Sequence, residues 1–177
     1  MQRDLPLWRT LLFVPVNVPK FVERAPRAGA DGLLIDLEDS IGPADKESAR
    51  AMLPAVAQQL NADGTDIVVR INRPWRHAVR VKALSEILAE LEMERGLAIG
   101  HTRMLLIVET AEGFEARGEI AKADPRIVAI SLGSEDFGLS MGMVADEETL
   151  LVPKQLMVAT ARAAGIRPMG FIGSIAE

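Results

Sequence analysis

Short apolar segments alternate with amphipathic segments along most of the chain. The apolar segments are rich in Leu, Ile and Val, which is the usual pattern of β-strands buried on both faces of a parallel sheet. Several of them end in charged or amide side chains instead of apolar ones. We predict six strands, at Leu11–Val16, Gly32–Asp39, Asp66–Asn72, Met104–Thr110, Ile127–Leu132 and Pro168–Ile172.

Helical periodicity fills most of the segments between these strands. It is strongest in Val81–Arg95, where apolar residues recur at helical spacing and Gly96 follows as a stop signal. Pro54 is expected to kink or split the second helix. The segment Gly138–Thr149, which is rich in Gly and Met, is predicted to be a loop. The predicted helices are Pro19–Ala28, Ala44–Asn61, Val81–Arg95, Phe114–Lys122 and Pro153–Ala164.

The strand ends distinguish between the two architectures that this alternation allows. A doubly wound sheet that binds a dinucleotide needs a glycine-rich turn after its first strand, but residues 16–19 read Val-Asn-Val-Pro. A (β/α)8 barrel instead builds its active site from polar residues at the ends of several strands. We therefore predict an α/β fold of the TIM-barrel type, with about six of its strands represented. The polar strand ends are Asp36/Glu38/Asp39, Arg70/Asn72, Glu109/Thr110 and Glu135/Asp136.

Composition narrows the chemistry. The 177 residues include no cysteine, which excludes disulfides, zinc–thiolate sites, iron–sulfur clusters and thiol nucleophiles. A net charge of -5 argues against nonspecific nucleic-acid binding, because that binding needs a basic surface. No apolar run approaches the roughly 20 residues of a membrane helix, and residues 1–9 lack the apolar stretch of a secretory signal. We expect a cytoplasmic protein without a membrane partner.

Two acidic residues at consecutive strand ends are the candidate metal ligands. Glu109 ends the fourth predicted strand, and Asp136 lies just past the fifth. Neighbouring parallel strands would bring both carboxylates to one edge, where hard oxygen ligands suit Mg²⁺ or Mn²⁺. Zinc is a poor alternative because His77 and His101 fall outside the strand ends. The simpler interpretation is that Glu109 caps the next helix and Asp136 forms a turn.

Arg70 is the candidate residue for binding an anion. It follows the apolar stretch 67–69 and should project from the end of its strand. A fixed guanidinium can hold a carboxylate in bidentate fashion or stabilise an oxyanion. Its alternative role is an ion pair with Asp36 or Glu38, and the two roles are compatible. If a metal is present, Glu38 and Asp39 are candidates to hold its bound waters.

The lysines argue against imine-forming aldolase chemistry, because none of them ends a strand. Lys20 and Lys46 fall in loops or at helix starts, where most lysines are solvated surface charges. They become substrate-binding candidates if the substrate carries phosphates, since an acidic protein would then need a local positive patch.

Taken together, five stretches resemble the citrate lyase β-subunit-like branch of the HpcH/HpaI aldolase family. No single stretch is specific, but all five occur in the expected order, and the resemblance extends over nearly all of the chain. The stretches are Leu-Phe-Val-Pro at 12–15, Asp-Gly-Leu-Leu-Ile-Asp-Leu-Glu-Asp at 31–39 with Pro-Ala-Asp-Lys at 43–46, Val-Arg-Ile-Asn at 69–72, Ile-Val-Glu-Thr at 107–110 and Gly-Ser-Glu-Asp at 133–136.

The resemblance implies roles for these residues. Glu109 and Asp136 would be the Mg²⁺ ligands, and Arg70 would bind the substrate and its enolate. Glu38 and Asp39 would hold metal-bound waters. The implied assembly is a TIM barrel in a homotrimer or hexamer, and the implied substrates are acyl-CoA thioesters of the citryl, malyl or citramalyl type. Further residues that we expect at the substrate are Gly133, Ser134, Lys20 and Lys46.

The chain also departs from the family pattern. The family usually has a helix and a strand ending in Leu-Pro-Lys before the helix near Val81, whereas here Val81 follows Arg80 directly. The family also continues into a C-terminal segment that gives a catalytic aspartate to a neighbouring subunit, whereas this sequence ends at Glu177. We therefore expect residues 1–177 to form one partial barrel domain, with segments missing at the 80/81 junction and beyond 177.

The expected function is a Mg²⁺-dependent carbon–carbon lyase that cleaves such a thioester through an enolate stabilised by metal and arginine. Two alternatives stay open. One is a non-catalytic subunit of a lyase complex that binds a CoA ester or dicarboxylate, and the other is a metal-dependent aldolase on free 2-oxo acids. The sequence does not distinguish the acyl group.

Overall fold

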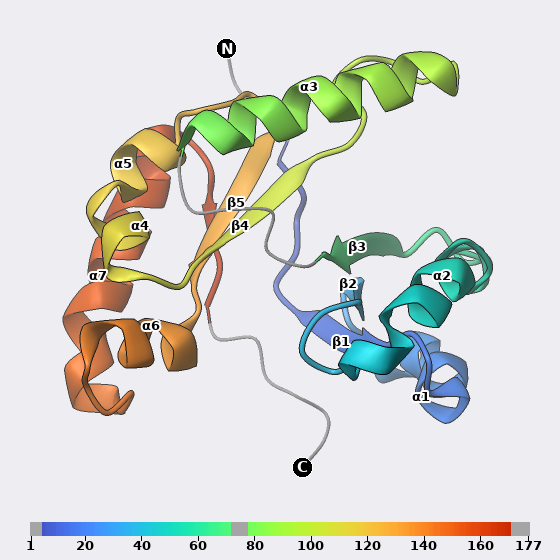
Figure 1. Cartoon of the computed structure of the whole chain (residues 1–177), viewed down its shortest axis with the longest axis horizontal. Helices are drawn as coiled ribbons and strands as arrows, with labels where there is room; N and C mark the ends of the chain where they lie inside the picture. The colour runs from blue at the N-terminus through green and yellow to red at the C-terminus, as the bar shows by residue number, and fades with distance from the viewer. Residues whose placement is uncertain (1–4, 72–77, 171–177) are drawn as a thin grey trace. The chain divides into compact units, whose positions relative to one another are not determined.

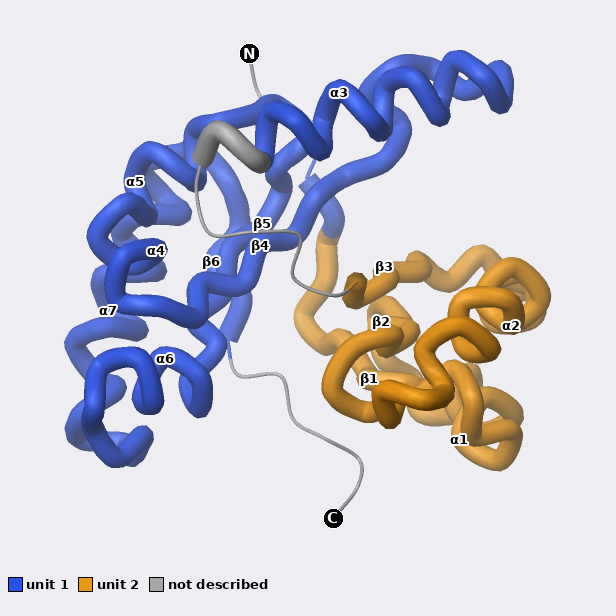
Figure 2. The backbone as a smooth tube through the Cα atoms, viewed as in Figure 1, with its two compact units in different colours: residues 1–6, 75–171 blue, residues 7–74, 172–177 orange. Residues whose placement is uncertain are grey.

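The computed structural model describes residues 5–71 and 78–170 (Figure 1). The chain divides into two compact units, one of residues 7–74 and 172–177 and the other of residues 1–6 and 75–171 (Figure 2). Three residues that the sequence analysis singled out, Asn72, His77 and Ile172, lie outside the described residues.

The unit of residues 7–74 is built on a parallel sheet of three strands in the order β1-β2-β3. The strands are β1 (Leu11–Pro15), β2 (Gly32–Asp36) and β3 (Asp66–Arg70). The connections between them are helical, as their patterns predict. They contain α1 (Pro19–Arg24), the short 3-10 helices η1 (Ala25–Ala28) and η2 (Pro43–Asp45), and α2 (Lys46–Leu60).

The core of this unit lies between the sheet and its two α-helices. Leu33 and Ile35 of β2 pack into the same apolar cluster as Val22 of α1 and Val56 of α2. Because side chains alternate between the faces of a strand, Asp36 lies on the opposite face of the sheet. Arg70 lies on that face too, because its neighbour Val69 packs against the helical side.

The second unit has the same plan. Its parallel sheet has the order β4-β5-β6, and α3 to α7 are its helices. The strands are β4 (Met104–Val108), β5 (Ile127–Leu132) and β6 (Arg167–Pro168). The helices are α3 (Ala78–Glu94), α4 (Ala111–Glu115), α5 (Arg117–Ile120), α6 (Ser134–Met141) and α7 (Glu147–Ala164).

Its core joins the sheet to these helices. Val108 and Leu132, at the ends of β4 and β5, belong to one buried cluster with Phe137 of α6 and Met157 of α7. The rings of Phe114 and Phe137 lie 5.1 Å apart and connect α4 to α6. The alternation of side chains therefore places Glu109 and Gly133 on the face of the sheet opposite this core.

The strand order agrees with the predicted fold type in part. Both sheets are parallel, and their strands are neighbours in the order in which they occur along the chain, as in a barrel and unlike a doubly wound sheet. Within the described residues the strands form two three-stranded sheets and no closed barrel. The 80/81 junction falls inside α3, so the helix crosses it without a break.

The loop predicted at 138–149 is shorter than expected and covers residues 142–146. Residues 134–141 form α6, and α7 begins at Glu147, six residues before the predicted start at Pro153. The signal for this start is a capping box, in which Asp146 and Thr149 each accept a hydrogen bond from the other's backbone N–H. Gly142 ends α6 in a left-handed conformation that other residues adopt at a cost.

Other boundaries differ by a few residues. Pro54 does not split α2, which runs continuously from residue 46 to 60. The helix expected at 114–122 is two short helices that meet at Ala116. Strand β2 ends at Asp36 instead of Asp39, because the amides of Glu38 and Ser40 turn back to bind the Asp36 carboxylate.

A buried ion pair fixes α3 to the amino-terminal end of β5. Arg126 donates to both carboxylate oxygens of Glu92 at 2.8 Å, and the two side chains are only 4% and 2% exposed. The Glu92 carboxylate also accepts the backbone N–H groups of Gly100 and Thr102. Because the hydrogen bond from Arg126 stabilises the charged form, the pKa of Glu92 lies well below its ordinary value.

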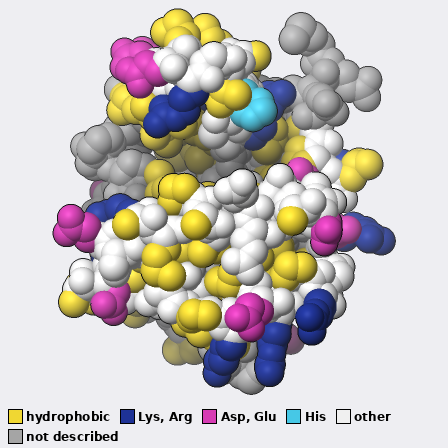
Figure 3. Space-filling model, turned by 90° about the vertical axis from the view of Figure 1, so that its right-hand side faces the viewer, with side chains coloured by type: hydrophobic (Ala, Val, Ile, Leu, Met, Phe, Trp, Pro, Cys, Tyr) yellow, Lys and Arg dark blue, Asp and Glu magenta, His cyan; other side chains and the backbone are white. Residues whose placement is uncertain are grey.

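None of the described helices combines the length and the apolar character needed to cross a membrane. On the face drawn in Figure 3, Lys and Arg side chains are interspersed with acidic and hydrophobic ones.

We predict that Arg126→Met destabilises the protein, because it leaves the Glu92 carboxylate buried without its cation. The melting temperature should fall by about 5 °C or more. The control is Arg95→Met, since Arg95 is exposed just past the end of the same helix. Equal melting temperatures for the two variants in a thermal scan would contradict a stabilising role of the pair.

Candidate active site

Arg70 and Asp36 form a bidentate ion pair at the carboxyl ends of β3 and β2. The strand register places the two residues side by side. Arg70 Nε donates to Asp36 Oδ1 at 2.8 Å, and Arg70 Nη2 donates to Asp36 Oδ2 at 2.7 Å. This is the ion pair with Asp36 that the sequence analysis gave as one role of Arg70.

The two acids after β2 approach the remaining nitrogen of the same guanidinium. Arg70 Nη1 donates to Asp39 Oδ2 at 2.9 Å and lies 3.5 Å from Glu38 Oε2. Asp39 is 68% exposed, whereas the Glu38 side chain is 13% exposed. The centre of the guanidinium lies over the ring of Phe13, 4.9 Å from the ring centre. The structure therefore brings Arg70, Glu38 and Asp39 together.

The ion pair holds both partners in their charged forms. Burial alone raises the pKa of Asp36, but the hydrogen bonds from Arg70, Ser40 and Glu38 outweigh burial and hold it at about 2. Burial also opposes the charged form of Arg70, and by itself it would lower the pKa of this residue. The hydrogen bonds and the charge interaction with Asp36 outweigh burial and raise the pKa of Arg70 above its ordinary value. The Arg70 guanidinium and the Asp36 carboxylate are thus both charged at neutral pH.

The two candidate lysines differ in their surroundings. The Lys46 ammonium donates to the backbone carbonyl of Leu37 at 3.0 Å and to that of Glu38, so it braces the turn that follows β2. Lys20 is exposed in the first turn of α1, and its ammonium lies 5.0 Å from the ring centre of Phe21. A substrate-binding role for either lysine stays a prediction.

Glu109 lies against Gly133 at the carboxyl ends of β4 and β5. The register pairs Val108 with Leu132, and the Gly133 amide donates to the Val108 carbonyl at 2.9 Å. A Cβ atom at residue 133 would meet Glu109 Cγ at 2.4 Å and Oε1 at 2.9 Å. Glycine is therefore needed at 133 for close approach, so that the Glu109 carboxylate can lie over the start of α6.

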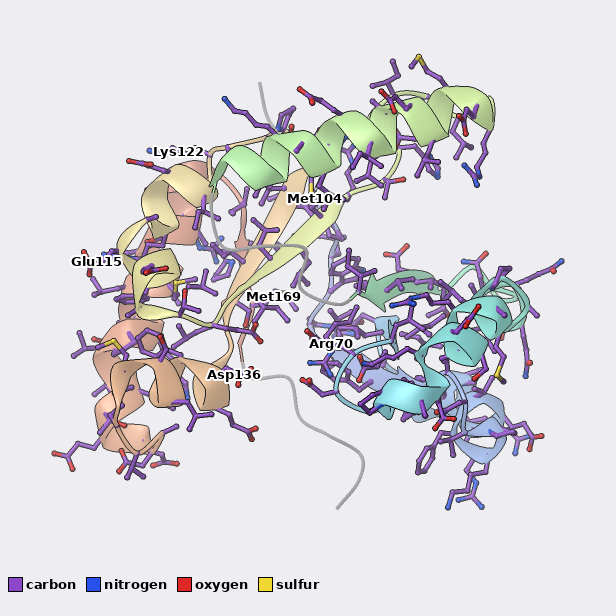
Figure 4. The ribbon with its side chains drawn as sticks, viewed as in Figure 1. Arg70, Met104, Glu115, Lys122, Asp136 and Met169 are labelled. Atoms are coloured by element: carbon purple, nitrogen blue, oxygen red, sulfur yellow. The ribbon has the colours of Figure 1, made fainter. Side chains whose placement is uncertain are left out.

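Asp136 is the third residue of α6, which begins directly after Gly133. It is half-buried and lies at the end of the helix next to β5 (Figure 4). Ser134 opens the helix, and its hydroxyl is buried without a hydrogen-bond partner among the described residues. Thr110, and not Glu109, caps α4 by accepting the Gly113 amide at 3.1 Å. The capping alternative for Glu109 is therefore wrong.

This pair of carboxylates fits magnesium in its donor chemistry. Mg²⁺ commonly binds one or two protein carboxylates and keeps several waters or substrate oxygens. Within residues 5–71 and 78–170 there is no group of three or more His, Asp or Glu side chains placed to hold a metal. Because residue 133 has no side chain, the Glu109 carboxylate can lie beside the first turn of α6.

Sequence reasoning missed Phe13 as a neighbour of Arg70. The signal was present, because Leu12 and Val14 pack toward the helices and strand alternation puts Phe13 on the face of Arg70. His101, the histidine within the described residues, is exposed and away from the strand ends, as predicted.

Sequence comparisons connect the chain with carbon–carbon lyases. The family model described as HpcH/HpaI aldolase/citrate lyase matches residues 9–80 and 75–174. The citrate lyase subunit beta of Leuconostoc mesenteroides subsp. cremoris is 32% identical over 90% of this chain and 62% of its own length. The L-malyl-CoA/beta-methylmalyl-CoA lyase of Rhodobacter capsulatus is 30% identical over 76% of this chain. The chain spans 62% and 51% of the lengths of these two relatives.

Solved structures show the same fold. The citrate lyase beta subunit of M. tuberculosis, in a complex with oxaloacetate and magnesium, has a TM-score of 0.66. It is 26% identical, and the match covers 94% of this chain and 78% of that one. A magnesium/glyoxylate complex of Haloferax volcanii malate synthase matches with a TM-score of 0.82 over 95% of this chain and 64% of that one. At 17% identity, this second match supports the fold alone.

We predict that Gly133→Ala destabilises the protein by about 1–3 kcal/mol, because the added methyl group forces the Glu109 side chain to move. Gly118→Ala is the matched control, since no atom lies within 4 Å of the Cβ position there. Alanine should be neutral or stabilising at 118, inside α5. Urea unfolding of both variants measures the difference, and an unchanged Gly133→Ala variant would show that Glu109 does not need this space.

The low pKa of Asp36 predicts a dependence of stability on acid. The pKa of Asp36 is held at about 2 in the folded protein, below its ordinary 3.8. The charged carboxylate therefore stabilises the folded state at pH values above 3.8. This contribution, about 2 kcal/mol, is lost as the pH falls from about 5 toward 2. The advantage of the wild type over Asp36→Asn in urea unfolding should therefore shrink between pH 6 and pH 2.5. A difference in unfolding free energy between wild type and Asp36→Asn that stays constant over this pH range would contradict a low pKa for Asp36.

Proposed function

The chain belongs to the HpcH/HpaI aldolase/citrate lyase family, and from this premise we propose that the protein is a Mg²⁺-dependent carbon–carbon lyase. Its proposed substrate is a CoA thioester of the citryl, malyl or citramalyl type. The observation that carries the proposal is the placement of two carboxylates, Glu109 directly after β4 and Asp136 in the first turn of the helix that follows the neighbouring parallel strand β5. The names of the relatives, a citrate lyase subunit and a malyl-CoA lyase, support the reaction class.

Glu109 and Asp136 are the proposed ligands of the metal. A bound Mg²⁺ would polarise the hydroxy acid or oxo acid portion of the substrate. Oxaloacetate and magnesium, which are bound in the complex of the M. tuberculosis relative, fit this choice of ion and of oxygen-rich substrate. Gly133 contributes by its small size, and the Ser134 hydroxyl is available for a polar atom of the substrate.

Arg70 is the proposed stabiliser of the enolate. In this cleavage the substrate hydroxyl gives its proton to a base and becomes a carbonyl, and the electron pair of the broken carbon–carbon bond moves onto the thioester as an enolate. Protonation of the enolate carbon then gives the second product. A guanidinium that is permanently charged and already oriented stabilises this developing charge without reorganising in the transition state. Glu38 and Asp39 lie beside Arg70 and are proposed to hold metal-bound waters. A trimeric or hexameric assembly stays a prediction.

The test is turnover of malyl-CoA and citramalyl-CoA by the purified protein, with and without Mg²⁺. The proposal predicts activity that EDTA abolishes and Mg²⁺ restores. Glu109→Ala and Asp136→Ala should each lower kcat by on the order of 100-fold or more, because both remove a ligand of the same ion. Titration calorimetry with Mg²⁺ alone should show weaker binding in both variants.

Glu112→Ala is the control for these variants. Glu112 is exposed in the first turn of α4, three residues after Glu109. It should leave both turnover and Mg²⁺ affinity unchanged. Thioester binding without turnover would instead favour a binding subunit of a lyase complex, and cleavage of free 2-oxo acids that ignores CoA would favour an aldolase. Wild-type activity in Glu109→Ala would reject the metal site.

A further inference from the structure

We propose that Asp36 is a positioning residue, which holds the Arg70 guanidinium in the single orientation in which Arg70 acts on the substrate. This inference rests on the proposed function of Arg70. Asp36 was expected from the sequence only as an alternative partner of an ion pair. The geometry points to a more specific role, because every polar atom of the Asp36 side chain is committed to fixed groups.

The carboxylate of Asp36 is saturated by hydrogen bonds. Its Oδ1 accepts from Arg70 Nε at 2.8 Å and from the backbone N–H of Glu38 at 2.8 Å. Its Oδ2 accepts from Arg70 Nη2 at 2.7 Å and from the backbone N–H of Ser40 at 3.1 Å. The residue is 1% exposed. Asp36 therefore has neither the exposure nor the free lone pairs to bind a substrate, and it acts through Arg70.

The pair determines which edge of the guanidinium remains for a ligand. An arginine side chain has five N–H donors in a planar fork. Asp36 takes one edge, the Nε and Nη2 donors that point toward β2. The remaining donors are on Nη1 and the outer side of Nη2, and Nη1 faces Asp39, which is 68% exposed. The Arg70 side chain is 17% exposed and Nη1 is held by the exposed Asp39 carboxylate, so an anionic oxygen gains this outer edge by displacing Asp39.

Two further contacts restrict the arginine. The guanidinium carbon lies over the ring of Phe13, 4.9 Å from the ring centre, so the aromatic ring limits its movement on that side. The backbone carbonyl of Arg70 accepts the Leu37 amide at 3.0 Å, which fixes the end of β3 against the turn after β2. The position of the Arg70 guanidinium, the edge that it turns toward Asp36 and the end of β3 are therefore all fixed before a substrate arrives.

Loss of the Asp36 charge would release the guanidinium to its other acidic neighbours. Glu38 and Asp39 already lie within 3.5 Å and 2.9 Å of Nη1. Without Asp36, the Nε and Nη2 donors of Arg70 can also turn onto either of them, and the substrate must then displace a bidentate carboxylate instead of the single contact between Nη1 and Asp39. A small misplacement of a catalytic group is enough to lower a rate by about 100-fold.

The experiment is a double-mutant cycle in the full chain, using wild type, Asp36→Asn, Arg70→Ala and the double variant. We measure kcat and KM with malyl-CoA and Mg²⁺, together with the melting temperature. Asp36→Asn should lower kcat by on the order of 10- to 100-fold. In the Arg70→Ala background the same change should lower kcat no further, because Asp36 acts only through Arg70. An equal loss of kcat in both backgrounds, or no loss in folded Asp36→Asn, overturns the inference.

Asp31→Asn is the matched control. Asp31 precedes β2 and is also paired with an arginine, since it accepts Arg9 Nη2 at 2.9 Å and the backbone amides of Arg9 and Thr10. It lies at the opposite end of the strand from Asp36. Removing its charge should lower the melting temperature and leave kcat unchanged. A loss of kcat that simply follows the melting temperature across both asparagine variants would show a structural role alone.

A second readout keeps the inference testable if Asp36→Asn does not fold or if the wild type does not turn over malyl-CoA. The Arg70 Nε–H signal in a ¹H–¹⁵N spectrum, assigned by its absence in Arg70→Lys, should exchange slowly with water in the wild type. The affinity for oxaloacetate with Mg²⁺ then replaces kcat, with Asp36→Glu as the second variant. Slow exchange and weakened binding in Asp36→Glu, without turnover by the wild type, would reject the lyase and retain the positioning role. Rapid exchange in the wild type would reject the positioning role itself.

Discussion

The parallel register of neighbouring strands is the constraint on which both candidate clusters depend. A buried strand carries few polar side chains, so polar groups can begin only where the strand leaves the sheet. Parallel pairing brings consecutive strands to an end at the same edge, as Asp36 beside Arg70 and Leu132 beside Val108 show. Residues far apart in the sequence thereby become neighbours without any long loop to bring them together.

The side of the sheet matters as much as its edge. In each unit the helices pack on one face, and the candidate residues lie on the other by strand alternation. In the first unit, Asp36 saturates one edge of the Arg70 guanidinium, and burial makes the pair rigid. In the second unit, Gly133 leaves the space in which the Glu109 carboxylate lies over the start of α6.

Much of the fold could be predicted from periodicity, and the errors have physical causes. Five of the predicted strands are present close to their expected places, because runs of Leu, Ile and Val have few alternatives to a buried sheet. The strand expected at 168–172 is observed only as the two-residue β6 at 167–168. The helix α6 was missed because its glycine and methionine residues have no strong periodicity, and its packing through Phe137 stabilises it. Strand β2 ends early because hydrogen bonds to a side chain replaced the sheet ladder after Asp36.

By itself, the sequence determined which polar residues lie at or just beyond the strand ends, and so which side chains could carry chemistry. Only the tertiary structure decided how those side chains are used. Arg70 binds Asp36 in bidentate fashion and turns only Nη1 toward Glu38 and Asp39. Lys46 donates to backbone carbonyls, and the ring of Phe13 lies beside the guanidinium. Periodicity encodes the burial of each position along one strand, whereas pair geometry depends on the register between strands, which one-dimensional spacing does not contain.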